Sequence, residues 1–274
     1  MTKIDDKIED AIKEVEITYL RVDTGQRELR VDFVAVEEPL HLIIGQEHYV
    51  TILSTPFQKR ELVIGHLITE GMLKKLDEIK EIRISAEKCE ITLRSDVKIK
   101  ERLALTVPFQ RVIASACATP EEWPLYKLID RLKIPKVTSS ITVAAKIIAE
   151  STKKFSNAST IHSKTGGVHA AAIHRQDGEV IAFAEDVGRH NAIDKAVGIA
   201  VTNHCDLAES FLVSTGRVTG DIALKAARTA IPIVASLAAA VNSGIEVAQR
   251  TELTLIGFVR GNRMNIYTHP ERLI

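Results

Sequence analysis

Eleven consecutive residues, 185–195, concentrate side chains that could bind a ligand or move a proton. The segment reads Glu-Asp-Val-Gly-Arg-His-Asn-Ala-Ile-Asp-Lys. An apolar run precedes it at 180–184 and a helical pattern follows it, so it lies where a strand gives way to a helix. In α/β proteins such junctions often form ligand sites, because the first N–H groups of the helix are unpaired. We therefore expect four of these residues to shape a pocket: Asp186, Arg189, His190 and Asp194.

Two further polar clusters follow predicted strands. Ser-Thr-Gly-Arg ends the apolar run at 211–214, and Arg-Gly-Asn-Arg at 260–263 follows the run at 253–259. The carboxyl ends of parallel strands lie at one edge of a sheet, so these clusters should meet the first one there. The planar guanidinium of arginine donates two hydrogen bonds to adjacent phosphate oxygens, although any one arginine after a strand could simply be solvated. An arginine-bearing cluster after each of three predicted strands predicts a site for a phosphorylated, nucleotide-sized ligand. The arginines that would hold it are Arg189, Arg217, Arg260 and Arg263.

The three cysteines differ in their surroundings. Cys117 lies in the small, polar segment Ser-Ala-Cys-Ala-Thr-Pro at 115–120, which offers no bulky apolar side chains to bury a thiol. Free cysteines are usually buried and inert, and we expect this of Cys89 and Cys205. An accessible thiol can act as a nucleophile or a sulfur carrier once it loses its proton. Cys117 is therefore the candidate reactive thiol.

The remaining sequence predicts an α/β protein with a boundary near residue 115. Strands are expected at 15–20, 30–36, 40–44 and 49–53, then a helix opening at 55–56, a strand group at 80–107 and an exposed connector at 107–124. Helices are expected at 125–134 and 138–154. Beyond residue 160, strands at 168–174, 180–184, 211–214, 232–236 and 253–259 alternate with helices at 191–203, 220–230 and 243–250. This alternation predicts a mainly parallel sheet in three layers.

The composition excludes several classes of function. The chain has 274 residues, with 36 Lys and Arg against 36 Asp and Glu, so no overall basic charge favours nucleic acid. No apolar run reaches the ~18 residues that indicate a membrane span. The charged residues 1–17 lack the apolar core of a secretion signal. Three scattered cysteines without a C-x-x-C motif are typical of a reducing compartment, so we expect a cytoplasmic protein.

Six motifs together resemble the FdhD/NarQ family of formate dehydrogenase accessory proteins. They are EEPL (37–40), ELVIGHLITEGML (61–73), TGGVHAAA (165–172), EDVGRHNAIDKAVG (185–198), STGRVTGDIALKAA (214–227) and GFVRGNRMNIYTHPERL (257–273). The resemblance spans nearly the whole chain. It implies a three-layer, cytidine-deaminase-like α/β domain at 125–274, a smaller α+β domain at 1–115, and a cysteine-bearing connecting loop at 116–124.

The resemblance also implies a function. Members of this family are sulfurtransferase-type sulfur carriers, which pass sulfur from a cysteine desulfurase to the bis(molybdopterin guanine dinucleotide) molybdenum cofactor required by formate dehydrogenase. Cys117 matches the first cysteine of the family's C-x-x-C motif and would carry the persulfide, whereas Pro120 replaces the second cysteine. GDP would mimic the guanine nucleotide part of the cofactor. The family's cofactor-binding stretch corresponds to Phe258, Val259, Arg260, Gly261, Asn262 and Arg263.

Three alternatives remain at this stage. A zinc deaminase needs H-x-E and P-C-x-x-C, but this chain has His190-Asn191-Ala192 and Ser-Thr-Gly-Arg at 214–217, so we expect no zinc. The missing second cysteine favours a cofactor chaperone or guanine nucleotide-binding module without sulfur chemistry. Cys117 could instead join two subunits or ligate a shared metal. We expect a homodimer, whereas the metal (molybdenum or tungsten) and the client enzyme are left open.

Overall fold

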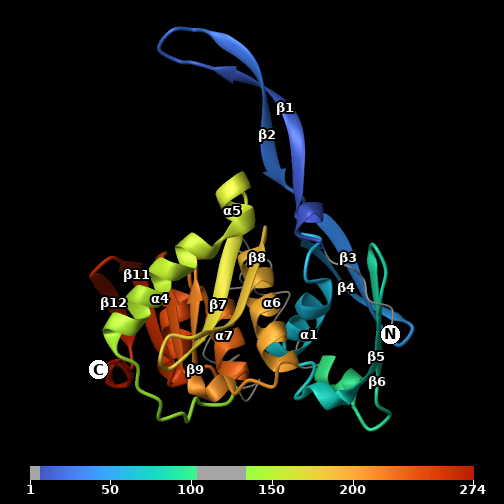
Figure 1. The fold of residues 1–274 in the computed structure, drawn as a ribbon. Coiled ribbons are helices and arrows are strands. Elements are labelled where there is room, and N and C mark those ends of the chain that lie inside the picture. The colour runs from blue at the N-terminus through green and yellow to red at the C-terminus, as the bar shows by residue number, and fades with distance from the viewer. Residues whose placement is uncertain (1–6, 104–133) are drawn as a thin grey trace, which may run out of the picture.

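The computed structural model describes residues 7–103 and 134–274, apart from the side chains of residues 156 and 157 (Figure 1). Two β-sheets lie on either side of a layer of helices, and a two-stranded arm extends from them. Cys117, the connecting segment 116–124, the predicted boundary near residue 115 and nearly all of the predicted helix at 125–134 lie outside the described residues.

The larger sheet has six strands in the order β12-β11-β10-β9-β7-β8. They are β7 (His169–Arg175), β8 (Val180–Asp186), β9 (Ser210–Ser214), β10 (Ile233–Ser236), β11 (Thr254–Arg260) and β12 (Arg263–Thr268). The five predicted strands are all present, but in this sheet only β9 with β10 and β10 with β11 pair in parallel. The expected mainly parallel sheet is mixed, because the short turns at 176–179 and 261–262 make β7–β8 and β11–β12 hairpins.

Helices cover both faces of this sheet. Helices α6 (Arg189–Thr202), α7 (Gly220–Arg228) and α8 (Asn242–Arg250) lie on one face, and α4 (Ala145–Ala158) lies on the other. Neighbouring residues of β9 show why: Leu212 is buried with α6 and α7, whereas Val213 is buried with Ile148 of α4. Successive strand side chains point to opposite faces, so a strand such as β9, which is buried at every position, must be covered on both. The short helix α5 (Thr160–Thr165) follows α4.

The N-terminal half forms a second sheet, in the order β4-β3-β6-β5. Its strands are β3 (Glu38–Ile44), β4 (Glu47–Ser54), β5 (Ile79–Ile84) and β6 (Lys88–Leu93), and α1 (Lys59–Thr69) packs against it. Four short 3-10 helices occur at Ile8–Ala11, Leu76–Glu78, Leu207–Glu209 and Pro270–Arg272.

Helices α1 and α6 cross so closely that only glycine fits at the contact. A Cβ atom added to Gly65 would lie 1.7 Å from the carbonyl oxygen of Asp194, and one added to Gly198 would lie 1.9 Å from that of Glu61. The main apolar core accordingly includes residues from both halves of the chain, with Leu62 and Val63 of α1 in the same cluster as residues of α6. The two predicted halves therefore share one core.

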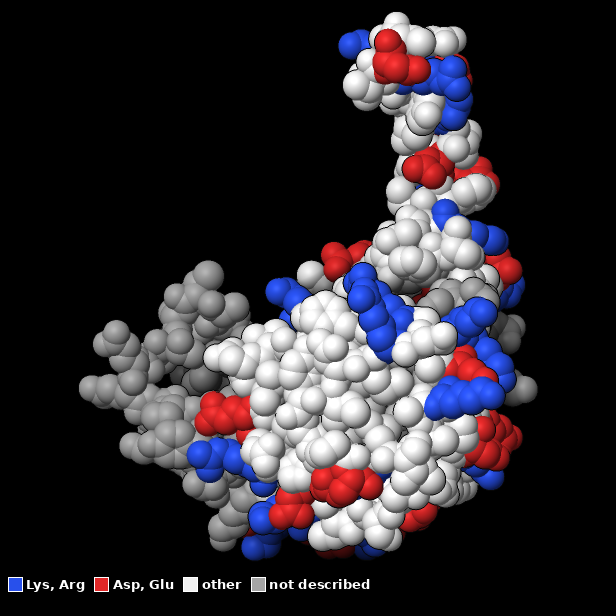
Figure 2. All heavy atoms as spheres, turned by 90° about the vertical axis from the view of Figure 1, so that its left-hand side faces the viewer, with Lys and Arg blue, Asp and Glu red and all other residues white. Residues whose placement is uncertain are grey.

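The arm is the antiparallel hairpin of β1 (Ile12–Leu20) and β2 (Arg27–Ala35). It stands clear of the body of the protein, as Figures 1 and 2 show from two sides. Among the described residues the body contacts the arm at its base, where Ala35 lies close to Gly167, which follows α5.

Two predicted elements differ from the structure. The helix expected at 138–154 begins only at Ala145, because the β-branched stretch before it is extended and Val143 bridges to Leu273. The strand group expected at 80–107 ends at Leu93, and residues 99–103 are helical. In the described part of the chain, the helices all fall short of the length and apolar character needed to cross a membrane.

Candidate functional site

The polar clusters lie along one edge of the six-stranded sheet. Strands β8, β9, β10 and β11 all point the same way, since two antiparallel steps relate β8 to β9 through β7. Their carboxyl ends, and the residues that follow them, therefore share an edge, as the sequence predicts. This edge is on the side of the arm, because Gly167 precedes β7 there and approaches Ala35 of β2.

The turn between β8 and α6 is organised by Asp186. This residue is completely buried, and its Oδ1 accepts hydrogen bonds of 2.8 Å from the Gly188 N–H and the Asn191 side chain. Its Oδ2 accepts one from the Thr55 N–H at 3.1 Å and lies 2.6 Å from Nζ of Lys195. Both oxygens are therefore occupied within the protein. Asp186 positions the turn that presents the neighbouring residues, and its predicted part in a ligand pocket stays a prediction.

Glu185, the residue before, has a similar positioning role. Its carboxylate accepts hydrogen bonds from the N–H groups of Thr160, Ile161 and His162, at 2.9–3.0 Å, and so caps the start of α5. Lys195 also donates to the carbonyl oxygen of Glu185 at 3.2 Å. The conspicuous acid–base content of the segment 185–195 thus serves largely to fix its backbone.

Arg189 opens helix α6 and supplies a fixed positive charge. It packs on Gly216, where an added Cβ would lie 2.8 Å from Cβ of Arg189. Its buried Nε has no hydrogen-bond partner among the described residues. The first turn of α6 contains no acidic residue, so the helix dipole and the guanidinium both favour an anion here.

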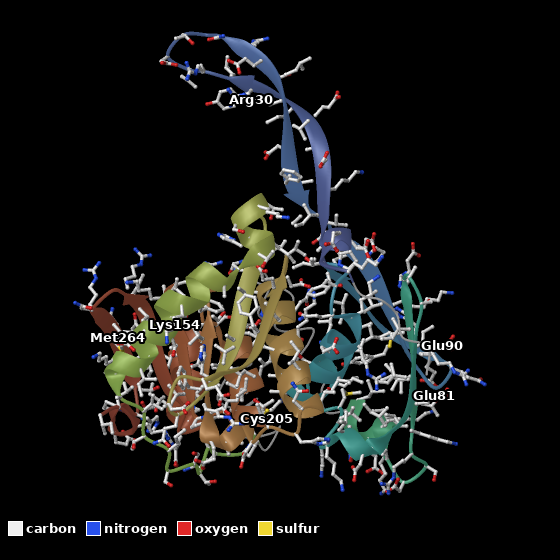
Figure 3. All side chains as sticks on the ribbon, in the orientation of Figure 1. Arg30, Glu81, Glu90, Lys154, Cys205 and Met264 are labelled. Atoms are coloured by element: carbon white, nitrogen blue, oxygen red, sulfur yellow. The ribbon has the colours of Figure 1, made fainter. Side chains whose placement is uncertain are left out.

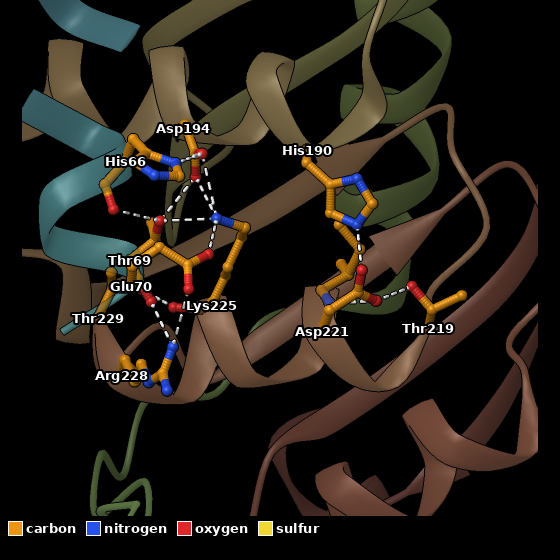
Figure 4. Close-up of polar contacts among 11 residues, drawn as sticks. His66, Thr69, Glu70, His190, Asp194, Thr219, Asp221, Lys225, Arg228 and Thr229 are labelled. Carbon is orange, nitrogen blue, oxygen red and sulfur yellow. Dashed lines mark hydrogen bonds and ion pairs between the residues drawn. The ribbon is translucent and has the colours of Figure 1, made fainter. Parts of the chain in front are cut away.

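His190 forms a hydrogen-bonded chain with Asp221 and Thr219 (Figure 4). Its Nε2 pairs with one carboxylate oxygen of Asp221, and the hydroxyl of Thr219 donates to the other. Burial alone would raise the pKa of Asp221, but the hydrogen bonds of His190 and Thr219 hold it below its usual range. The side chain of His190 is 32% exposed. Asp221 therefore stays ionised and orients an accessible imidazole at this edge.

His169 and Thr215 complete this part of the edge, although sequence reasoning did not single them out. Nδ1 of His169, at the start of β7, lies 3.1 Å from Oγ1 of Thr215, just after β9. Partial burial and the positive charge of Arg189 lower the pKa of His169, so its imidazole is neutral at pH 7. The signal that could have identified both is position: each flanks a strand at the same edge as Arg189 and His190.

Farther along the edge, the stretch 258–263 borders an open cleft of about 750 Å³. Val259, Arg260, Gly261 and Asn262 line one side of it, and α4 lines the other with Lys146 and Lys153 among its residues. Met264 of β12, labelled in Figure 3, also lines this cleft. Phe258 and Arg263 are exposed. Glu150 lines the cleft too and lies 3.9 Å from Lys146, so three cationic side chains face one carboxylate there. This net positive charge suits a phosphorylated ligand, and the two lysines were not predicted.

Two other predicted residues have different surroundings. Arg217 is exposed just after β9, at the predicted edge. Asp194 is buried between α1, α6 and α7 rather than in a pocket, which corrects its predicted role. Arg189 belongs to a helix on one face of the sheet, whereas Arg260 meets α4 on the other. The convergence of all four arginines on one ligand stays a prediction.

Asp194 belongs to a buried charge network (Figure 4). Nζ of Lys225 lies 2.9 Å from its Oδ1 and 2.7 Å from Oε1 of Glu70, and Nδ1 of His66 lies 3.1 Å from its Oδ2. Burial alone would raise the pKa of Asp194, but Lys225 and His66 hold it at about 2. The same carboxylates raise the pKa of Lys225 against the effect of its burial. The network joins α1 to α6 and α7 through charges that are largely buried.

Fold and site together define an α/β protein with a basic, histidine-bearing sheet edge. The sequence model of the FdhD/NarQ family matches residues 35–274, and the chain belongs to this family. It is 34% identical to the sulfur carrier protein FdhD of Sulfolobus acidocaldarius, over 96% of this chain and 98% of that protein. It is 31% identical to the same-named protein of Staphylococcus aureus strain MRSA252, over 93% and 94%.

A solved structure shares the fold. It is a protein of Desulfotalea psychrophila assigned as a formate dehydrogenase accessory protein, and it matches with a TM-score of 0.75 and 23% identity. The match covers 96% of this chain and all of that one. The overall fold is therefore not peculiar to this sequence.

Proposed function

We propose that this protein is a sulfur carrier that takes sulfur from a cysteine desulfurase and passes it to a guanylated molybdenum cofactor, for use by formate dehydrogenase. The observation that carries the proposal is the match to the Sulfolobus acidocaldarius sulfur carrier at 34% identity, which covers both chains almost completely. The basic sheet edge supports it, since a carrier of this kind must hold an anionic cofactor while sulfur is added.

The substrate in this proposal is bis(molybdopterin guanine dinucleotide) molybdenum, whose phosphates need cationic partners. The cleft between 259–262 and α4 offers Arg260, Lys146 and Lys153 for them. Arg189 and the start of α6 offer a second binding position for an anion, such as a phosphate, on the same edge. The substrate itself supplies the metal and its sulfur ligands. The cytidine-deaminase-like assignment of the larger domain, with its lost zinc site, is part of the same proposal.

The sulfur would travel on Cys117. Its thiolate attacks the terminal sulfur of the donor's persulfide, a new S–S bond forms on Cys117, and the donor cysteine leaves as a thiolate. No second thiol takes part in this step, so Pro120 at the position of the family's second cysteine is compatible with it. His190 provides an oriented imidazole at the sheet edge for proton transfer.

Complementation tests the proposal. In a host that lacks its own accessory protein, the wild-type chain should restore formate dehydrogenase activity, and Cys117→Ala should not. Cys205→Ala is the matched control, because Cys205 is partly exposed but lies on the opposite side of the protein from the arm (Figure 3). Full activity with Cys117→Ala would exclude the persulfide role.

The alternative is a cofactor chaperone that binds the guanine nucleotide without moving sulfur. The single cysteine in the segment 115–120 is the observation that favours it. A chaperone would bind GDP equally well with or without Cys117, and Cys117→Ala would still support formate dehydrogenase activity. The same complementation experiment therefore separates the two functions.

A further inference from the structure

The positive charge of Arg189 has no carboxylate partner in the described part of the chain, and its buried Nε lacks a hydrogen-bond partner there. The carboxylates nearby are occupied. Glu185 caps α5, and Asp186 is hydrogen-bonded within the turn before α6. Asp221, in the first turn of α7, pairs with His190. A partly buried guanidinium that the protein itself does not neutralise favours an anionic ligand.

The imidazole of His190 is held in one orientation by Asp221 (Figure 4). An ionised carboxylate can only accept hydrogen bonds, so it bonds to the proton on Nε2, and this selects the tautomer with a lone pair on Nδ1. The hydroxyl of Thr219 and the N–H of Ile222 both donate to Oδ1 of Asp221, while Nε2 of His190 bonds to Oδ2. Three donors therefore fix the carboxylate and, through it, the ring.

The other ring nitrogen of His190, Nδ1, is open to solvent. The side chain is 32% exposed, and Nδ1 has no hydrogen-bond partner among the described residues. Figure 4 shows this atom on the side of the ring away from Asp221. A neutral imidazole offers a lone pair there, whereas an imidazolium offers an N–H donor. Because Asp221 accepts from Nε2 in both states, Nδ1 can take up a proton without the loss of any contact.

The charged groups around His190 come from three elements: Asp221 from α7, Arg189 from α6 and His169 from the start of β7. Burial lowers the pKa of His169 most, and the charges of Arg189, His162 and His190 lower it further. The basic groups are therefore close enough to repel one another's charge. A bound anion offsets such repulsion, so its binding at this edge is coupled to the uptake of a proton.

We propose that His190 is a phosphate-binding residue: Nδ1 takes up a proton from solvent and donates it in a hydrogen bond to an oxygen of the ligand's phosphate, while Nε2 keeps its bond to Asp221. Arg189 supplies a second positive charge beside it. Asp221 and Thr219 are positioning residues, because they act on the ligand only through the imidazole. The inference rests on the proposed function for the identity of the ligand, a guanine nucleotide diphosphate, and adds the binding atom and the proton that accompanies it.

A phosphate suits this pair of groups better than a carboxylate does. A phosphoryl group carries a charge of about −1.5 to −2 near neutral pH, which matches one guanidinium and one imidazolium. A carboxylate would leave one of these two charges without a partner. The planar fork of Arg189 can also bond to two oxygens of a phosphate and leave a third for Nδ1 of His190.

Calorimetry of GDP binding to the full-length protein tests the proposal. At pH 8 the terminal phosphate of GDP is already ionised, since its last pKa is about 6, so any proton taken up goes to the protein. Titrations in Tris and in HEPES, which differ in ionisation enthalpy, give the number of protons bound. We expect the wild type to take up as much as one proton per GDP. His190→Gln should lose this uptake and bind GDP about 10-fold or more weakly, and Asp221→Asn should reduce both.

Two matched variants serve as controls. His204→Asn should behave as wild type, because His204 is exposed beyond the other end of α6. His169→Gln should keep the proton uptake, since the proposal assigns the proton to His190. A wild type that binds GDP without proton uptake or does not bind GDP, uptake that persists in His190→Gln, or uptake that is lost in His169→Gln would each overturn the proposal.

Nitrogen NMR on the wild type gives a measurement that does not depend on the folding of a variant. In protein labelled with 15N-histidine, the long-range 1H–15N spectrum should show His190 with a proton on Nε2 alone at pH 8, and on both nitrogens when GDP is bound. A Nδ1 that stays unprotonated in the complex would contradict the proposal. Sulfur loading of Cys117 is measured separately, so a failure here leaves the sulfur-carrier function standing.

Discussion

Replacement of Lys225 by methionine should strongly destabilise the protein. Methionine keeps the length of the side chain but removes the ammonium that lies within 3.1 Å of both oxygens of Asp194 and 2.7 Å from Glu70. Asp194 is 1% exposed, so its charge would be left in the interior, with the hydrogen bonds of His66 and Thr69 as its remaining contacts. Loss of one partner from a buried ion pair costs about 3–5 kcal/mol, and we expect about 3 kcal/mol here.

The stability lost in Lys225→Met should depend on pH, because the carboxylate of Asp194 titrates. The pKa of Asp194 is lowered from 3.8 to about 2 on folding, which corresponds to about 2 kcal/mol of stability. Because the folded pKa is the lower one, this contribution is complete above pH 3.8 and is lost as the pH falls through about 2. In Lys225→Met the carboxyl protonates more readily in the folded state. The difference in stability between variant and wild type should therefore narrow as the pH falls from 7 toward 3.

Urea unfolding followed by far-UV circular dichroism, at pH 7 and at pH 3, measures both effects. Lys146→Met is the control, because Lys146 forms only an exposed pair with Glu150 on α4, 3.9 Å apart. Its free energy of unfolding should change by less than about 0.5 kcal/mol. Two results would refute the assignment of this network as a buried structural element. One is a fall of less than about 1 kcal/mol in the free energy of unfolding of Lys225→Met. The other is a difference in stability between variant and wild type that widens as the pH falls.

Three other predictions concern helix packing, ligand binding and thiol reactivity. Gly65→Ala should lower the free energy of unfolding by about 2–3 kcal/mol, since its Cβ would meet the Asp194 carbonyl at 1.7 Å, and urea unfolding would show this. Arg260→Ala should weaken GDP binding by about 10- to 100-fold in calorimetry, as expected for a lost charged hydrogen bond, and unchanged affinity would remove it from the site. Burial raises the pKa of Cys89 to about 12, so iodoacetamide at pH 8 should leave it unmodified until denaturant is added. Cys205, which is partly exposed, should react without denaturant.

The sequence predicted the strand-to-helix junctions well, and for a local reason. Strands β8 and β9 each end in a polar cluster, and helices α6 and α7 begin with the apolar periodicity of a covered helix. These signals depend on a few neighbouring residues, so they can be recognised without knowledge of the fold. The same signals predicted that the polar clusters share one edge of the sheet, given the assumption that the strands run parallel.

What the sequence could not predict depends on distant partners. Asp194 resembles a pocket residue in its local segment, and only the approach of α1 at Gly65 shows that it is enclosed. Lys225 supplies its counter-charge from another helix. His169 likewise became a site residue only through Thr215, which lies after a different strand. Such pairings are set by tertiary packing, which local pattern does not encode.

The central claim, that Cys117 carries sulfur, is tested most directly by peptide mass spectrometry after incubation with a cysteine desulfurase and cysteine. The account predicts that the peptide containing Cys117 gains the mass of one sulfur atom, that dithiothreitol removes it, and that the Cys205 peptide stays unchanged. An unmodified Cys117 peptide, from protein that still binds GDP and from a desulfurase shown to be active, would contradict it.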